Sequence, residues 1–121
     1  MPHLRLPEGP QAGPFRVIPV VRRPGWHEVA LWEPERGILV VADAVGTASY
    51  FRAPGEPLGV HPFLRLTPPR ALRGLAPHHL LVGHGPGIHG PDAPAALAEA
   101  LATARRRAPR WLAGLPGARR R

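Results

Sequence analysis

The chain has 121 residues and a formal net charge of +8, carried by 16 arginines against 8 acidic residues, with no lysine. Its length suits one domain with a hydrophobic core. The lack of cysteine excludes a disulfide framework, a zinc–cysteine cluster and a thiol nucleophile. No apolar stretch approaches the roughly 20 residues that cross a bilayer, and the N-terminus lacks the apolar core of a signal peptide. We therefore expect a soluble cytoplasmic protein without a membrane partner.

The positive charge is concentrated at the C-terminus. Seven arginines lie between positions 105 and 121, whereas residues 1–104 hold nine arginines and eight acidic residues and are nearly neutral. Most basic tails are simply solvated, but such a tail also suits binding to RNA or DNA, so nucleic-acid binding is an alternative function. Few thermolabile side chains, with no asparagine and one glutamine, and proline-rich loops suit a thermophile, and GC-rich coding gives the same bias.

Three strands are predicted in the first part of the chain. Residues 1–13 are rich in proline and glycine and predict an N-terminal arm. Residues 15–21 form an apolar run in which Pro19 indicates a sheet edge or a β-bulge. Residues 27–32 and 38–42 are separated by turn-forming residues, Glu-Pro-Glu-Arg-Gly, and this arrangement predicts a β-hairpin.

The second half is predicted to alternate loops with short elements. Residues 45–69 have no clear periodicity and indicate a long loop, and residues 70–76 follow two prolines as a short helix. Residues 80–82 form a buried strand, residues 83–90 a loop, and Asp92 caps a further helix. The apolar face of that helix consists of Leu97, Ala100, Leu101 and Ala104, at i, i+3, i+4 and i+7.

Polar residues suited to chemistry lie where the predicted strands end. Asp43 directly follows residues 38–42, and His84 follows residues 80–82 after one glycine. Antiparallel pairing brings His27, at the start of its strand, beside the Asp43 end. Zinc, iron and manganese accept such a set of imidazoles and a carboxylate. The structural alternative is that the histidines bond to the backbone and Asp43 caps exposed amides.

Two segments carry a resemblance to a known family. Residues 28–44 read Glu-Val-Ala-Leu-Trp-Glu-Pro-Glu-Arg-Gly-Ile-Leu-Val-Val-Ala-Asp-Ala, and residues 80–86 read Leu-Leu-Val-Gly-His-Gly-Pro. Over residues 14–107 the chain resembles the C-terminal half of the metallo-β-lactamase superfamily. Members of that αββα family have a Gly-His loop before a Val-Ala-Leu strand, then a Gly-Asp-Ala turn and a Gly-His-Gly turn.

The resemblance implies both a site and a fold. Asp43 stands at the metal-bridging aspartate, His84 at the last metal-binding histidine and His27 at the middle one. The implied fold is α/β: half of an αββα sandwich, with one mixed or antiparallel sheet and two or three helices over residues 14–107. Residues 108–121 are then a basic C-terminal tail.

The chain also departs from the family pattern. The signature His-x-His-x-Asp-His is absent, since no two histidines are two positions apart and neither aspartate precedes a histidine. Ala42 replaces the usual glycine before the aspartate. One chain therefore cannot form a two-metal hydrolase of the usual kind. We expect at most one zinc, iron or manganese ion, with His61 or His89 adding to the implied ligands, or no metal at all.

Half of a sandwich leaves one sheet face to be covered. Helices of the same chain cover one side only, so the apolar side chains of Val29, Leu31, Leu39 and Val41 need a further partner. The two halves of the superfamily fold are related by a pseudo-twofold axis. We therefore expect a homodimer that imitates the whole sandwich.

Three functions are compatible with these features. The first is a noncatalytic or singly metal-binding protein that acts as a homodimer, and the missing signature motif favours it. The second is a metal-dependent hydrolase, of unnamed substrate, whose site is completed across the dimer. The third is nucleic-acid binding through the arginines of residues 105–121.

Overall fold

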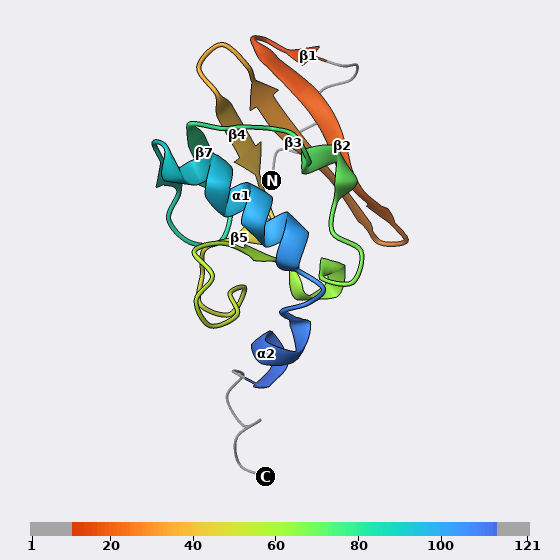
Figure 1. The fold of residues 1–121 in the computed structure, drawn as a ribbon. Helices are drawn as coiled ribbons and strands as arrows, with labels where there is room; N and C mark the ends of the chain where they lie inside the picture. Colours follow the sequence, from red (N-terminus) through yellow and green to blue (C-terminus); the bar gives the residue numbers. More distant parts are fainter. Residues whose placement is uncertain (1–10, 114–121) are drawn as a thin grey trace.

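The computed structural model describes residues 11–113 and shows an α/β protein (Figure 1). A mixed sheet has the strand order β1-β2-β3-β4-β7-β8, and β5 and β6 form a second, two-stranded sheet. The strands are β1 (Gln11–Ala12), β2 (Phe15–Arg23), β3 (Trp26–Glu33), β4 (Ile38–Val41), β5 (Val45–Gly46), β6 (Gly59–Val60), β7 (His79–Val82) and β8 (Ile88–His89). The helices are α1 (Asp92–Thr103) and α2 (Ala108–Ala113), and two short 3-10 turns are η1 (Pro62–Leu64) and η2 (Arg70–Leu72).

The three strands predicted in the first half are confirmed. β2 and β3 pair antiparallel, and their register shifts between Pro19 and Val21, as expected of a proline at a bulge. β3 and β4 form the predicted hairpin. β4 then pairs in parallel with β7, so the carboxyl ends of these two strands lie side by side at the same end of the sheet.

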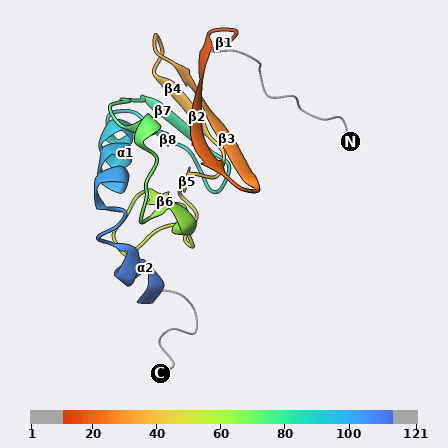
Figure 2. The ribbon, with the colours of Figure 1, turned by 90° about the vertical axis from the view of Figure 1, so that its right-hand side faces the viewer.

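Register and α1 together decide which side chains form the core. Trp32 lies opposite Leu39, whereas Leu31 lies opposite Val40, so the two pairs point to opposite faces. Leu39 and Ala30 are fully buried in the core that also includes the apolar side of α1. Figure 2 shows α1 on one side of the sheet, with no helix of the described residues on the other.

The predicted apolar face is therefore divided between two sides of the sheet. Leu39 and Val41 belong to the covered core, where both are fully buried. Val29 and Leu31 are only half-buried and lie on the opposite side. The prediction treated the four as one face because it used the apolar pattern of each strand without the register between strands, and a shift of one residue reverses the face.

The long loop predicted over residues 45–69 contains more structure than expected. Val45 pairs with Val60 and Gly46 with Gly59, which gives the small β5–β6 sheet. The helix predicted over residues 70–76 is only the three-residue turn η2, since Arg73 already has an extended backbone. The loop predicted over residues 83–90 contains β8, which forms the edge of the main sheet.

A buried ion pair holds the segment between β5 and η2. The Arg65 guanidinium donates to Glu56 Oε1 at 2.5 Å, to the Phe51 carbonyl at 2.9 Å and to the Ala104 carbonyl at 3.3 Å. The Ala53 amide donates to the same carboxylate oxygen at 2.7 Å. Both charged side chains are about 1% exposed. This network ties the segment to the end of α1, and the sequence analysis did not predict it.

The apolar face of α1 is confirmed. Leu97, Ala100, Leu101 and Ala104 are all less than 5% exposed. The cap prediction is wrong by one residue, since Pro91 occupies the N-cap position and Asp92 is the first helical residue. Its carboxylate still lies in the first turn, where the helix dipole favours a negative charge. None of the helices in residues 11–113 is long and apolar enough to span a membrane.

The described residues include parts of the predicted N-terminal arm and of the predicted C-terminal tail, and both parts contain regular secondary structure. Gln11 and Ala12, at the end of the predicted N-terminal arm, pair with β2 as β1. α2 lies at the start of the predicted basic tail. Residues 1–10 and 114–121 are outside the part of the chain that the structure describes.

Candidate functional site

The candidate site lies beyond the carboxyl ends of β4 and β7. Asp43 comes two residues after β4 and His84 two residues after β7, and parallel pairing places both residues at the same end of the sheet. The loops also bond to each other. The Gly83 amide donates to the Ala42 carbonyl at 2.9 Å, and the Thr47 amide donates to the His84 carbonyl at 2.9 Å.

The two glycines around His84 allow this close approach. A Cβ atom at position 83 would lie 2.6 Å from the Ala42 carbonyl oxygen. Gly85 has φ +101°, and a Cβ atom there would overlap the Thr47 hydroxyl. Both positions therefore require glycine, which gives the Gly-His-Gly sequence a physical reason: it holds His84 against the turn that carries Asp43.

His84 forms hydrogen bonds through both ring nitrogens. Its Nε2 lies 2.7 Å from Asp43 Oδ1, and its Nδ1 lies 2.7 Å from the Tyr50 hydroxyl. The Phe51 ring stacks on the imidazole with the centroids 5.3 Å apart. The side chains of His84 and Asp43 are 41% and 49% exposed, so solvent reaches both groups. The sequence analysis missed Tyr50, because it lies in a loop whose path no spacing rule predicts.

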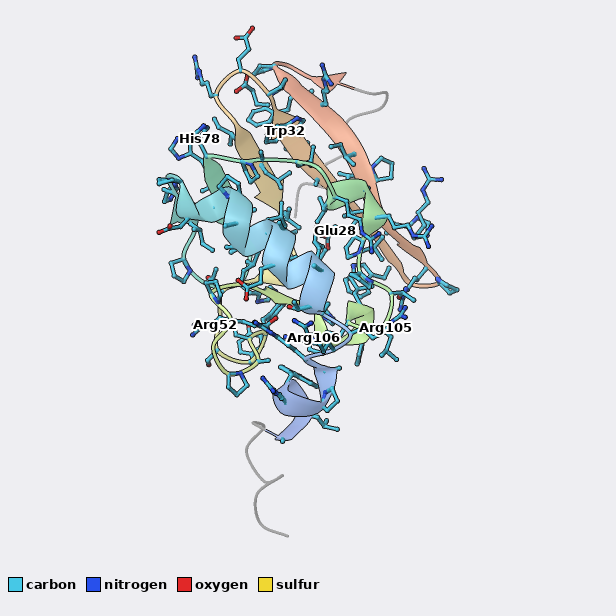
Figure 3. The ribbon with its side chains drawn as sticks, viewed as in Figure 1. Glu28, Trp32, Arg52, His78, Arg105 and Arg106 are labelled. Atoms are coloured by element: carbon cyan, nitrogen blue, oxygen red, sulfur yellow. The ribbon has the colours of Figure 1, made fainter. Side chains whose placement is uncertain are left out.

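Glu28 fixes the turn that carries Asp43. Its buried carboxylate accepts hydrogen bonds from the backbone amides of Asp43, at 3.1 Å, and Ala44, at 3.0 Å. The Trp26 indole N–H also donates to it, at 3.4 Å. Figure 3 labels Glu28 near the middle of the molecule. An acidic residue inside an apolar strand was the available signal for this role, and the sequence analysis did not use it.

His61, in the segment after β6, lies at the same end of the sheet as Asp43 and His84. Its backbone amide donates to the Ala44 carbonyl at 2.8 Å, and its Nδ1 accepts from the Phe63 amide at 3.1 Å. The ring meets the Trp26 ring edge-on, with centroids 4.7 Å apart. Burial lowers the pKa of His61; the nearby Asp43 carboxylate opposes this shift and His84 adds to it. The imidazole is therefore mostly neutral at neutral pH.

These side chains surround a shallow depression of about 440 Å³. Aromatic rings form much of its wall, and the two imidazoles and one carboxylate supply its polar atoms. The residues that line it are Gly25, Trp26, Asp43, His61, Phe63 and His84. The structure therefore brings together three of the four residues expected to form the site.

The fourth expected residue, His27, is not at the depression. The adjacent Trp26 and Glu28 point toward the site, and successive strand residues point to opposite faces, so exposed His27 lies on the other side of the sheet. Trp26 occupies the place expected for an imidazole. His89 is also elsewhere, beside His79 on β7 and β8.

No group of three or more His, Asp or Glu side chains within residues 11–113 is arranged to hold a metal ion as the side chains lie. His84 and Asp43 instead bond to each other. Comparison of the chain with protein-family models, curated proteins and solved structures found no match.

Part of the basic C-terminal region bonds to the protein itself. Arg105 donates to the Leu66 carbonyl at 2.8 Å and 3.2 Å, and Arg107 donates to Glu99 at 2.7 Å. Figure 3 shows Arg105 and Arg106 just beyond the end of α1. Two of the seven arginines in residues 105–121 thus have partners within the fold.

Proposed function

We propose that the protein binds one divalent transition-metal ion at the depression, through Asp43, His61 and His84, and that it acts by binding and not by hydrolysis. The observation that carries this proposal is the 2.7 Å contact between His84 Nε2 and Asp43 Oδ1. It places an imidazole and a carboxylate side by side where solvent has access. Zinc, iron and manganese accept two imidazoles and one carboxylate. Such an ion would act as a Lewis acid when bound.

Tyr50 suits the role of a positioning residue for His84. With the proton on Nε2, His84 donates to Asp43 and accepts from the Tyr50 hydroxyl at Nδ1. With the proton on Nδ1, the same hydroxyl oxygen accepts it, and Nε2 presents its lone pair to an ion. A hydroxyl is both donor and acceptor, so Tyr50 holds the ring in either tautomer, as outer partners of metal-binding histidines do.

His61 is suited to be the third donor. Metal ions bind neutral imidazole and compete with protons for it. Because burial lowers the pKa of His61, that competition is weak at neutral pH. Its ring must turn from the Phe63 amide to offer Nδ1, so we expect an affinity in the micromolar range and not the tight binding of a closed structural site.

Binding without hydrolysis is favoured by the composition of the depression. Asp43 is the one carboxylate among the described residues that line it. A metal-dependent hydrolase needs a base to orient water in addition to its ligands. The alternative hydrolase, with a site completed across a dimer, requires that base to come from a second copy of the chain.

The test is metal content and zinc titration of untagged protein. We expect the Asp43→Ala, His84→Ala double variant to bind one zinc ion per chain fewer than wild type. His27→Ala is the matched control, because its exposed imidazole lies on the other side of the sheet. Equal zinc binding by wild type and the double variant would overturn the proposal, as would no binding by either.

The uncovered sheet face supports a second part of the proposal: two chains form a homodimer that completes an αββα sandwich. Val29, Leu31 and Val40 are half-buried apolar side chains on this face, and Leu81 is 41% exposed. Burying them against a second copy removes apolar surface from water. This is the arrangement that the resemblance to half a metallo-β-lactamase fold implies.

Light scattering of the purified protein at micromolar concentration tests the dimer. We expect twice the chain mass for wild type and the chain mass for Leu81→Arg, which puts a charge into the proposed interface. Ala98→Arg, on the exposed outer side of α1, is the control and should leave the mass unchanged. A monomeric wild type would overturn this part of the proposal.

A further inference from the structure

A pair of histidines lies at the other end of β7. His79 and His89 are directly opposite each other in the antiparallel β7–β8 pair, so their side chains share one face. Their Nδ1 atoms are 2.9 Å apart and their ring centroids are 5.1 Å apart. Both residues are exposed. Two rigid strand positions thus aim two nitrogen atoms at each other in contact with water.

We propose that His79 and His89 chelate one divalent transition-metal ion through their Nδ1 atoms. As neutral imidazoles the pair shares a single proton, one ring donating and the other accepting. Two ligands on a tetrahedral zinc with bonds of roughly 2.0–2.1 Å lie roughly 3.3 Å apart. The present 2.9 Å needs only a small opening to admit the ion, while the proton between the two Nδ1 atoms moves through solvent to Nε2 of the ring that carried it, so both imidazoles stay neutral. Water fills the remaining coordination positions.

The donor type selects the class of ion. Two imidazole nitrogens suit zinc, copper or nickel, whereas calcium and magnesium require oxygen ligands. Gly87 leaves room for one ring, since a Cβ atom there would lie 3.1 Å from His89 Nε2. A larger side chain at position 87 would therefore press on the ring and disturb the pair.

This site is distinct from the depression at Asp43. His79 begins β7 and His84 follows its far end, and the three steps from His79 to Val82 alone span on the order of 10 Å of extended strand. In Figure 3, His78 lies next to the start of β7 and well apart from Glu28. This inference does not rest on the metal site proposed at the depression. His79 lies on the same sheet face as Leu81, two residues further along β7, so in the proposed dimer the pair would lie on the interface side, at the edge strand β8 and its neighbour.

The experiment uses the Asp43→Ala, His84→Ala variant as background, so that the depression contributes no signal. Calorimetric titration with Ni²⁺ near neutral pH is expected to show one ion bound per chain with micromolar affinity. His79→Ala or His89→Ala in that background should weaken binding at least tenfold. His78→Ala removes an exposed neighbouring imidazole and is the matched control, with unchanged affinity expected.

Three results would overturn the inference. They are no Ni²⁺ binding by the background protein, equal affinity in His89→Ala, and an equal loss in the His78→Ala control. Circular dichroism of each variant checks the fold, and exposed positions such as these should tolerate alanine.

Discussion

Two of the contacts between a carboxylate and a nitrogen group of a side chain, Arg65–Glu56 and His84–Asp43, differ completely in their surroundings. The Arg65–Glu56 pair is about 1% exposed, and each member also bonds to the backbone: the Ala53 amide donates to Glu56, and Arg65 donates to the Phe51 carbonyl. The His84–Asp43 pair has a similar separation, 2.7 Å, but its members are 41% and 49% exposed. We expect the first pair to stabilise the fold. The second pair is exposed, so either member can exchange the hydrogen bond between them for one to water or for a contact with a ligand.

The difference follows from desolvation. A charge inside the protein has no water to turn to, so removal of its partner leaves it unpaired and typically destabilises a protein by about 3–5 kcal/mol. A solvent-exposed pair loses little when it is broken, about 0–1 kcal/mol, because water solvates both members. Stability and ligand binding should therefore separate between the two regions.

The largest effect is expected for Arg65→Ala. The change removes the closest cation of the buried Glu56 carboxylate, leaving it Arg107 at 3.8 Å, and it also removes two bonds to backbone carbonyls. We expect the free energy of unfolding to fall by about 3–5 kcal/mol, measured by urea denaturation. Arg73→Ala, at an exposed position, is the control and should have little effect. A loss below about 1 kcal/mol for Arg65→Ala would show that the buried pair is not what holds this segment.

Glu28→Ala is expected to have the next largest effect. Its carboxylate accepts from the amides of Asp43 and Ala44, and two buried donors lose their acceptor in the variant. We expect a loss of about 2–3 kcal/mol in urea denaturation, together with weaker zinc binding because the turn that carries Asp43 loosens. Glu35→Ala, at an exposed turn position, serves as control. Intact zinc affinity in Glu28→Ala would contradict the positioning role.

Asp43→Ala should separate binding from stability. The side chain is 49% exposed, so its loss should change the free energy of unfolding by about 0–1 kcal/mol. Zinc binding at the depression should nevertheless disappear, because the carboxylate donor is gone. Paired urea denaturation and zinc titration on the same preparation measure both quantities. A large loss of stability would mean that the His84–Asp43 contact is structural after all.

The smallest effect is a pH dependence from His61. Burial lowers its pKa in the folded protein below the ordinary value of 6.5, so the unfolded chain binds the proton more readily. Its contribution to stability is thus present above that value and is lost as the pH falls through the folded pKa. Between about pH 7.5 and about pH 5, the urea midpoint should fall further for wild type than for His61→Gln. Equal falls would exclude this linkage.

Much of the fold and part of the site could be predicted from local patterns. Apolar runs indicated β2 and β4, alternating apolar residues indicated β3, and the i, i+3, i+4 pattern indicated the face of α1 that is buried. Asp43 and His84 were identified because each follows a strand, and strand ends are visible in the sequence. The partners of these two residues were harder to predict, because they come from other segments.

Relations across segments explain what was missed. The predicted His27 ligand is replaced at the depression by Trp26, since one step along a strand reverses the face. Tyr50, Arg65 and the cross-strand partner of His79 depend on the paths of loops between elements. Local sequence patterns do not predict how these loops run. Their course depends on close backbone contacts between distant segments, such as Gly83 against the Ala42 carbonyl.

The sequence by itself determined β2, β3, β4, β7 and α1 and the strand-end positions of Asp43 and His84, because hydrophobic periodicity and turn chemistry act over a few neighbouring residues. Only the tertiary structure decided which apolar residues form the core, which residue stands beside His84, and that His79 meets His89 across two strands. Those outcomes depend on strand register and close packing, where contacts between residues far apart in the chain outweigh local preference.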